Sequence, residues 1–228
     1  MHTQPLRILG IADLHDRVDM LPQASDLDVD LIAFCGDLHN GSDRAKAKLA
    51  AKALASLGPP VLIIPGNTDH KDVVPDLWRK MGLKMIHGQS WRLRDIGFMG
   101  LGGMVVRDSK RLEVKKPTRY YLGEDEVYDL LARSHRDISS LKHRIVLAHQ
   151  PPMGARDRIY TGESTGSEGL SRFIDEFQPD LLLCGHIHED RGEAWIGSTR
   201  IVNVGEMGGG YGVVVEVDDE INIRWIEP

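Results

Sequence analysis

The sequence predicts an α/β protein, and three observations support this fold class. Over about the first 80 residues, short apolar runs alternate with segments of helical composition, which is the pattern of βαβ units with a largely parallel sheet. Beyond about residue 85, the segments become shorter and resemble antiparallel strands more than helical repeats. Several apolar runs stop at a glycine that is followed by a polar side chain. We therefore expect a βαβ-type first half and a second half that is richer in antiparallel strands.

The expected strands are short apolar runs that end at glycine, proline or polar residues. The last two runs alternate in polarity on either side of Asp218-Asp219-Glu220, which is typical of a hairpin. The predicted strands are 6–11, 29–34, 61–64, 91–93, 97–101, 145–148, 181–184, 200–204, 212–217 and 221–225.

Four segments have the composition or spacing of helices. Segment 43–57 is rich in Ala, Lys and Leu and contains no Gly or Pro, and Gly58-Pro59-Pro60 ends it. Ser167 is a suitable N-cap for the last helix. We expect residues 107–121 to form a surface loop or rim, and residues 153–169 to form a flexible loop beside a site. The predicted helices are 43–57, 75–81, 124–141 and 168–177.

Composition and charge exclude several classes of protein. With 228 residues, 41% apolar content and no convincing linker, the chain is expected to form a single domain over residues 1–228. Its net charge of -6 predicts no general attraction to nucleic acid or to an anionic membrane. No leader precedes the first strand and no apolar run approaches the ~18 residues of a membrane span, which predicts a cytoplasmic protein. The oligomeric state is left open. The last hairpin offers an edge strand that could pair with a second chain, but its acidic turn would equally well disfavour that pairing.

The two cysteines are expected to be reduced and buried. Cys35 and Cys184 each end an apolar run directly before a glycine, where a thiol commonly serves as a packing group. A disulfide is not expected without a secretory context.

Side chains that can bind metal follow five of the apolar runs. Because open α/β sheets gather their sites at the carboxyl ends of strands, tips far apart in the sequence can converge. Seven ligands are too many for one ion, whereas two divalent ions about 3.5 to 4 Å apart can share them and leave positions for water and substrate. A set of oxygen and imidazole ligands suits manganese, iron or zinc better than copper, and manganese is the first expectation. The candidate ligands are Asp13, His15, Asp37, Asn67, His149, His186 and His188.

These strand ends resemble the ordered motifs of the calcineurin-like metallophosphoesterase superfamily. Its series D-x-H, GD, GN, H and GH-x-H is matched by Asp13-Leu14-His15, Gly36-Asp37, Gly66-Asn67, His149 and Gly185-His186-Ile187-His188. Segments 100–103, 148–152 and 184–189 are similar to the predicted prokaryotic phosphoesterases related to the Icc protein. The resemblance spans nearly the whole chain, so residues 1–228 are expected to be one metallophosphoesterase domain.

The resemblance implies a fold, a ligand assignment and an activity. The implied fold is a four-layer α/β/β/α sandwich, in which two mixed sheets pack face to face with helices outside. The implied activity is hydrolysis of a phosphodiester or a phosphomonoester by a hydroxide that bridges two metal ions. The expected substrate is a small phosphorylated molecule, and no motif indicates a nucleotide, a lipid or RNA. One ion would be held by Asp13, His15 and His188, the other by Asn67, His149 and His186, and Asp37 would bridge them.

The general acid is the point at which the chain departs from the family pattern. Many members place a histidine directly after the GN asparagine, where it can protonate the leaving alkoxide, but this chain has Thr68 there. His39 and His70 are the candidate general acids, with a structural or solvated role as the alternative for each. If no acid is present, aryl phosphodiesters should be cleaved much faster than alkyl ones.

The remaining histidines and the long loop are expected to have simpler roles. Surface or packing positions are expected for His2, His87, His135 and His143. Arg156, Arg158 and Tyr160 would reach a phosphate or a base only if the loop closes, and a solvated loop is the simpler interpretation.

Two other functions remain as alternatives to an enzyme. A catalytically weak metal-binding scaffold for protein–protein interaction would keep the fold without turnover, as the related retromer scaffold subunit does. Thr68 favours this alternative, whereas the complete set of seven ligands disfavours it. The second alternative is an α/β domain whose histidines have no joint function. It would require all five motifs to occur by coincidence and in the right order.

Overall fold

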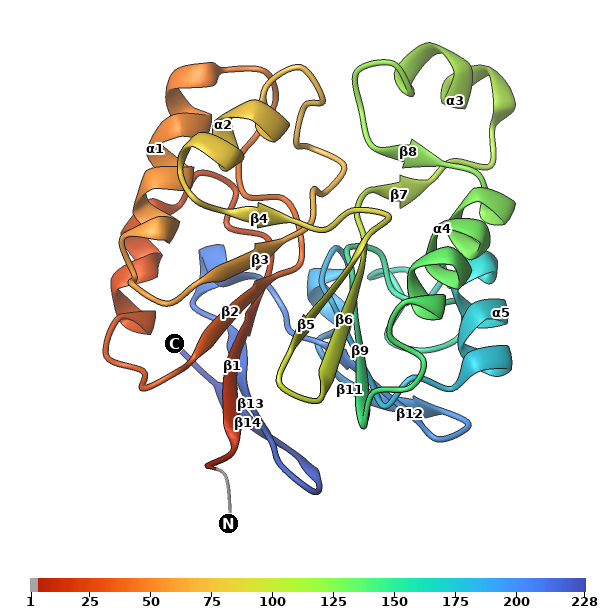
Figure 1. The fold of residues 1–228 in the computed structure, drawn as a ribbon. Coiled ribbons are helices and arrows are strands. Elements are labelled where there is room, and N and C mark those ends of the chain that lie inside the picture. Colours follow the sequence, from red (N-terminus) through yellow and green to blue (C-terminus); the bar gives the residue numbers. More distant parts are fainter. Residues whose placement is uncertain (1–3) are drawn as a thin grey trace.

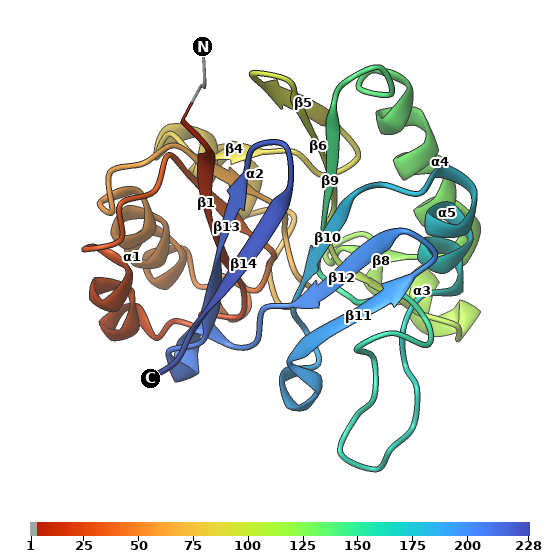
Figure 2. The same ribbon diagram turned by 90° about the horizontal axis from the view of Figure 1, so that it is seen from below.

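Two six-stranded mixed sheets lie at the centre of the molecule, which is described over residues 4–228 by a computed structural model (Figure 1). The sheets pack face to face, and helices cover the outer face of each (Figure 2). The layers therefore follow the order α/β/β/α, and the expected four-layer sandwich is confirmed.

The first sheet has the order β14-β13-β1-β2-β3-β4. Strands β1 to β4 run parallel to one another, whereas β13 pairs antiparallel with both β1 and β14. The last hairpin is therefore confirmed, and β14 is an edge strand. The bounds are β1 Leu6–Ile11, β2 Leu31–Phe34, β3 Val61–Ile63, β4 Lys84–Met85, β13 Gly212–Val217 and β14 Ile221–Ile226.

The second sheet has the order β11-β12-β10-β9-β6-β5. Its four inner strands are parallel, and the edge strands β11 and β5 pair antiparallel with their neighbours. The bounds are β5 Ser90–Leu93, β6 Ile96–Leu101, β9 His143–Ala148, β10 Leu181–Cys184, β11 Gly192–Ile196 and β12 Thr199–Asn203. A separate two-stranded sheet is formed by β7 Met104–Val105 and β8 Tyr121–Leu122.

Two helices cover each large sheet. Helices α1 and α2 lie on the first sheet, and α4 and α5 lie on the second (Figure 1). Helix α1 begins after Asp43, whose side chain accepts hydrogen bonds from two backbone N–H groups, and α5 begins after Ser167, which caps it as expected. The helices are α1 Arg44–Ala55, α2 Val74–Lys80, α3 Ser109–Lys115, α4 Glu124–Arg136 and α5 Glu168–Phe177, with short 3₁₀ helices at Val18–Ala24, His188–Asp190 and Met207–Gly209.

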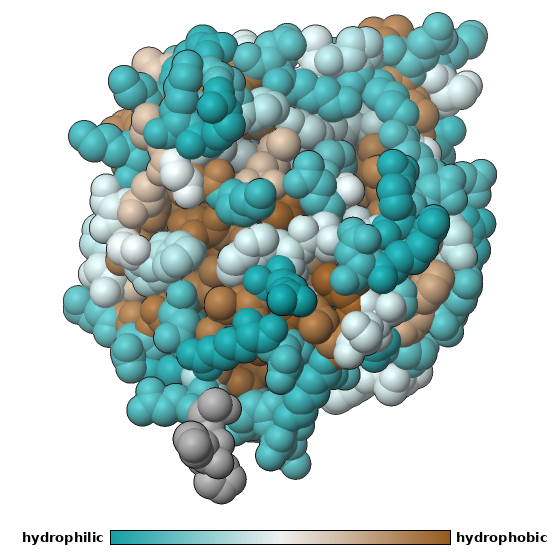
Figure 3. Space-filling view, in the orientation of Figure 1, coloured by the Kyte–Doolittle hydropathy of each residue, from teal (hydrophilic) through white to brown (hydrophobic). Residues whose placement is uncertain are grey.

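Alternation along the strands produces three apolar layers. Because successive side chains of a strand point to opposite faces, Leu9 packs under α1 and α2 while Ile8 faces the second sheet. In β10, Leu182 packs under α4 and α5 while Leu183 faces the first sheet. The central layer fixes how the two sheets sit on each other, and therefore how their strand ends meet. The face drawn in Figure 3 is largely hydrophilic, with apolar side chains visible mainly across its middle.

The structure corrects three predictions from the sequence. Residues 107–121 are not all loop, because they contain α3, a helix with no buried residue. The expected antiparallel character around 97–101 holds only for the pairing of β5 with β6, since β6 pairs in parallel with β9. Strand β11 was not predicted, because its alternation is half-exposed at the edge of the sheet.

The cysteines and the membrane prediction can also be compared with the structure. Cys35 and Cys184 are free and fully buried, and burial raises the pKa of both thiols, so the expected packing role is confirmed. Within residues 4–228, no helix is long and apolar enough to cross a membrane. The single domain over 1–228 and the cytoplasmic location stay predictions, and His2 lies outside the described residues.

Candidate metal centre

The carboxyl ends of five strands meet at one edge of the two facing sheets. Strands β1, β2 and β3 are parallel neighbours in the first sheet, and β9 and β10 are parallel neighbours in the second. Contacts at this edge join the two sheets directly. The backbone N–H of His186 donates to Oδ2 of Asp13 over 2.8 Å, and Nδ1 of His149 lies 2.9 Å from the carbonyl oxygen of Cys35. Strand tips that are far apart in the sequence therefore converge.

Two buried carboxylates form the centre of this cluster. Asp13 is fully buried and Asp37 is 2% exposed. Nε2 of His15 lies 3.7 Å from Oδ1 of Asp13 and 3.9 Å from Oδ2 of Asp37. Nε2 of His188 lies 3.4 Å from the same Oδ1 of Asp13. The ligand atoms of Asp13, His15 and His188 are all within 4.8 Å of one another, so the first expected ligand set is brought together.

The second expected ligand set is brought together around His149. Its Nε2 lies 3.0 Å from Oδ1 of Asn67 and 3.5 Å from Oδ2 of Asp37, and its ring centre is 4.9 Å from that of His186. Asp13, Asp37 and His149 form a second group that can hold an ion. The carboxylate of Asp37 therefore lies beside members of both sets, which is the position that the bridging role requires.

Three histidines are oriented by contacts through their Nδ1 atoms. Nδ1 of His15 lies 3.0 Å from Oδ1 of Asn40, and Nδ1 of His188 lies 3.3 Å from Oε2 of Glu206. Nδ1 of His149 faces the backbone carbonyl of Cys35. With these oxygens as acceptors, a neutral ring at each of the three positions would carry its proton on Nδ1 and offer the lone pair of Nε2 to a bound ion. This arrangement is typical of metal-ligating histidines.

The charges and unpaired atoms of the cluster fit a bound cation. Oδ1 of Asp13 is buried and has no hydrogen-bond partner among residues 4–228, which is costly for a carboxylate. Nε2 of His149 lies 3.0 Å from Oδ1 of Asn67, and both become acceptors without a donor once the ring releases its second proton and keeps the other on Nδ1. A divalent ion between such atoms would pair all of them, and the oxygen and imidazole donors suit manganese, iron or zinc.

Burial and neighbouring charges shift the ionisation of these groups. Burial raises the pKa of Asp37, but His149 outweighs this effect and holds that pKa well below its usual range. Burial lowers the pKa of His149, yet the charge of Asp37 raises it overall to about 9. Burial, together with His149, lowers the pKa of His186 to about 4. Asp37 is therefore a carboxylate and His186 a neutral imidazole at neutral pH, which are the forms that bind metal, whereas His149 keeps its second proton beside Asp37 and would have to release it when an ion binds.

Four of the seven expected ligands have a left-handed backbone. The φ angles are 54° at Asp13, 48° at His15, 57° at Asp37 and 68° at His186. This conformation is uncommon for residues other than glycine and costs on the order of 1 kcal/mol or more at each position. Such strain is concentrated where the strands turn abruptly to point a side chain into the cluster, which is typical of a functional site.

The glycines of the motifs make room for ligands from other strands. A Cβ atom on Gly66 would lie closer than 3.0 Å to the carboxylate of Asp37, and one on Gly185 would meet the carboxylate of Asp13 equally closely. A Cβ on Gly36 would lie 2.5 Å from Nδ1 of His149. Real Cβ atoms do not approach other atoms so closely, so each motif glycine leaves the space that a neighbouring ligand fills.

Asp69 connects the loops after β2 and β3. Its Oδ2 accepts hydrogen bonds from the backbone N–H groups of Asp37, over 3.1 Å, and Gly66, over 2.8 Å. Its Oδ1 lies 2.9 Å from Nδ1 of His39. Thr68 completes the connection, because its N–H donates to Oδ1 of Asp37 over 2.8 Å. Asp69 therefore positions the bridging candidate rather than contacting the ligand groups itself.

The two candidate general acids lie in different environments. His39 is fully buried; burial lowers its pKa, but the hydrogen bond to Asp69 raises it above the ordinary value overall. Its Nε2 has no partner among the described residues. His70 is partly exposed, and its Nδ1 accepts a hydrogen bond from the N–H of Asp72 over 3.4 Å. Neither belongs to the groups that can hold an ion, so their role as acids stays a prediction.

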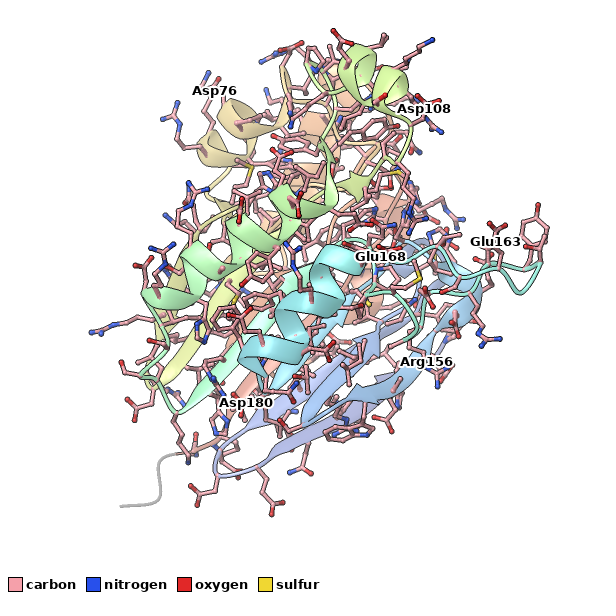
Figure 4. All side chains as sticks on the ribbon, turned by 90° about the vertical axis from the view of Figure 1, so that its right-hand side faces the viewer. Asp76, Asp108, Arg156, Glu163, Glu168 and Asp180 are labelled. Atoms are coloured by element: carbon pink, nitrogen blue, oxygen red, sulfur yellow. The ribbon has the colours of Figure 1, made fainter. Side chains whose placement is uncertain are left out.

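The long loop after β9 is anchored on β11 and on the short 3₁₀ helix that begins at His188. The guanidinium of Arg156 donates to the backbone oxygen of Glu193 and lies 3.3 Å from Asp190. The N–H of Arg158 also donates to Asp190, and Tyr160 is 87% exposed near the end of the loop. Figure 4 shows the loop, marked by Glu163, projecting from the molecule. The simpler interpretation of a solvated loop agrees with this arrangement.

Two residues that orient the ligands were missed in the sequence. Asn40 and Glu206 contact the Nδ1 atoms of His15 and His188. A signal for Glu206 was present, because it follows a glycine after the apolar run that forms β12. The rule that found the other strand ends would also have found this one.

A family comparison decides the class of this site. The model of the calcineurin-like phosphoesterase family matches residues 6–190, which contain all seven expected ligands. The chain belongs to the calcineurin-like phosphoesterases. This family is metal-dependent and typically dinuclear, and membership supports a hydrolase. The narrower likeness to proteins related to Icc stays a prediction.

Known relatives of this calcineurin-like phosphoesterase cover most of its length. It is 30% identical over 207 residues to the uncharacterized protein MJ1162 of Methanocaldococcus jannaschii, with 87% of each chain covered. The fold is similar to that of TT1561 of Thermus thermophilus, with a TM-score of 0.70, 17% identity and coverage of 97% and 99%. It is also similar to a dimetal phosphatase from Danio rerio, with a TM-score of 0.70, 10% identity and coverage of 99% and 97%.

Proposed function

We propose that this protein is a metal-dependent phosphoesterase that hydrolyses a phosphodiester or a phosphomonoester at a dinuclear centre. The observation that carries the proposal is the pair of buried carboxylates, Asp13 and Asp37, surrounded by three imidazole Nε2 atoms. Family membership supports the same class of reaction.

The proposal gives each of the seven residues a role. Asp13, His15 and His188 would hold one divalent ion, Asn67, His149 and His186 would hold the other, and Asp37 would lie between them. Manganese is the first expectation, with iron or zinc as alternatives. When bound, two such ions supply an activated water and neutralise charge on the phosphoryl oxygens.

The other residues of the chain would orient and shield this centre. Asp69 and the N–H of Thr68 fix the carboxylate of Asp37, so that its free oxygen stays directed at the imidazoles. Asn40, Glu206 and the carbonyl of Cys35 hold the imidazole protons on Nδ1. His39 or His70 would donate a proton to the leaving oxygen. If neither histidine acts as the acid, aryl esters, whose leaving groups need little protonation, should react much faster than alkyl ones, because Thr68 replaces the usual histidine.

The test is hydrolysis of bis-p-nitrophenyl phosphate and p-nitrophenyl phosphate by metal-stripped protein that has been resupplied with manganese. We expect turnover that depends on manganese and falls by about 100-fold or more in Asp37→Ala, since that variant removes the carboxylate shared by both ligand sets. The preferred substrate would distinguish a diesterase from a monoesterase.

The opposite result would support the scaffold alternative. If manganese, iron and zinc all gave no turnover while the protein still bound two ions per chain, the enzyme proposal would be abandoned. The search would then turn to a protein partner.

A further inference from the structure

A pocket lined by both polar and apolar residues borders the candidate metal centre, and the inference drawn from it rests on the proposed function. Its volume is about 210 Å³. His186 forms part of its wall, so the pocket borders the ligand cluster. Residues from β7 and the start of α3 form one side, and Gln150 and Thr165 form the other. Figure 4 shows Asp108 at the beginning of α3, on the same side of the molecule as the loop that carries Glu163.

The two sides of the pocket are held together by one buried amide. Oε1 of Gln150 accepts a hydrogen bond from the N–H of Val105 over 2.7 Å, and its Nε2 donates to the carbonyl oxygen of Thr165 over 2.6 Å. Gln150 is only 7% exposed. The width of the pocket is therefore fixed before any ligand binds, which lowers the entropic cost of binding.

The pocket carries more positive than negative charge. Arg107 and Arg111 contribute two guanidinium groups, whereas Asp108 is the only acid in its wall. Oδ1 of Asp108 already accepts a hydrogen bond from the backbone N–H of Arg111 over 3.0 Å, because it caps α3.

Both guanidinium groups keep donors for a ligand. Arg107 uses one nitrogen to donate to the carbonyl oxygen of Gly166 over 3.0 Å, and it lies 3.8 Å from Glu124. The guanidinium of Arg111 lies 5.9 Å from the ring centre of Tyr121 and forms no ion pair within residues 4–228. Each guanidinium has five N–H donors, so most of them remain free.

The size of the pocket limits what it can hold. Pockets that enclose a whole small-molecule ligand are typically about 300 to 1,000 Å³, so a pocket of this size takes only part of one. Planar guanidinium groups bind carboxylate and phosphate through paired hydrogen bonds. The matching part is therefore a small oxyanion, attached to the phosphoester that lies at the metal centre.

We propose that this pocket selects phosphoesters that carry a second anionic group, a carboxylate or a phosphate, and that Arg107 and Arg111 bind that group. These arginines determine specificity and take no part in the chemical step. The substrate class is then a small phosphoester that carries a second anionic group besides its ionised phosphoryl group, and diesters whose alkyl or aryl groups are uncharged are poor mimics of it.

Two matched diesters test this proposal by turnover. One is p-nitrophenyl 2-carboxyethyl phosphate, and the other is its carboxamide, which has the same leaving group and nearly the same shape. We expect the wild-type kcat/KM to be at least about 10-fold higher for the carboxylate, mainly through KM, and the preference to disappear in R107Q/R111Q. Lys110→Gln is the matched control, because it removes a charge from the same short helix without lining the pocket. It should keep the preference.

A binding measurement separates failure of the pocket from failure of the proposed function. Calorimetric titration with 3-phosphonopropionate and its amide needs no turnover, and the acid should bind at least about 10-fold more tightly to wild type. The analogue of 3-phosphonopropionate in which a phosphate replaces the carboxylate tests the other oxyanion that the pocket is proposed to bind. Equal kcat/KM and equal affinity for acid and amide in wild type would overturn the proposal. Full retention of the preference in folded R107Q/R111Q would also overturn it.

Discussion

The histidines of this protein differ in what their Nδ1 atoms contact. At His15, His149 and His188 the Nδ1 atom faces an oxygen, which leaves Nε2 free to bind metal. At His87 the Nδ1 atom instead accepts a hydrogen bond from the N–H of Gly102 over 2.9 Å. His87 must therefore remain neutral for this bond to exist, and burial lowers its pKa to about 4.

This difference at His87 predicts a pH effect on stability. The folded state binds the proton only near pH 4, whereas the unfolded chain binds it below about pH 6.5, so acid favours unfolding between these values. Stability is complete above about pH 6.5, and the loss down to pH 4 should reach roughly 3 kcal/mol. His87→Gln keeps an acceptor but does not titrate. In urea titrations, the free energy of unfolding of the variant minus that of wild type should rise by roughly this amount from pH 7 to pH 4.

The remaining pH dependence of the chain cancels in that difference. A difference that stays constant over the same range would show that His87 does not titrate as described. His87, His135 and His143 all have packing contacts or buried positions, in agreement with the role expected from the sequence.

Which side chains converge was predictable at the residue scale, but how they are oriented was not. The seven ligands could be named because each follows an apolar run at a strand end. Their supports come from elsewhere in the chain: the strand-end rule marks Glu206 as a site residue but not as the partner of His188, and no pattern links Asn40 to His15. The sequence also could not show that His39 is fully buried against Asp69.

Among the structural elements, the turns after the strands contribute most to the site. Gly66 is a clear example, because its backbone lies against the carboxylate of Asp37 and its φ angle is not in the left-handed region. Any effect of adding a methyl group there is therefore steric.

Gly66→Ala should displace Asp37 and lower both kcat and manganese affinity by about 10- to 100-fold, the range seen when groups that support metal ligands are changed. Gly123→Ala is the matched control, since a Cβ at Gly123 meets nothing within 4 Å. It should stay within about 2-fold of wild type. The measurements are kcat for bis-p-nitrophenyl phosphate and a manganese titration. Wild-type values in a folded Gly66→Ala variant would contradict this account of the motif glycines.

Elements with a strong apolar pattern were predictable, and elements at the edges were not. Helix α1 was predicted from its Ala, Lys and Leu composition without Gly or Pro, and β10 from its continuous apolar run, which is fully buried. Helix α3 buries no residue, and β11 exposes alternate residues at the edge of its sheet, so neither produced a clear signal.

At the scale of the whole molecule, the face-to-face packing of the sheets creates the site. The first sheet supplies three strand ends and the second supplies two, and the apolar layer between them holds both sets at the same edge. Local patterns in the sequence predicted the strands but could not predict their neighbours. The chain order gives no sign that β13 pairs with β1 or that β6 pairs with β9, because these partners are far apart in the sequence. The resemblance to a known family supplied the two-sheet architecture, but these pairings came only from the structure.

Anomalous diffraction from crystals grown with manganese would locate the bound ions. We expect two anomalous peaks per chain, about 3.5 to 4 Å apart, with the carboxylate of Asp37 between them and Asp13 and His149 on opposite sides. An absence of peaks beside Asp13 and Asp37 at saturating manganese, or peaks found only elsewhere on the protein, would contradict this expectation.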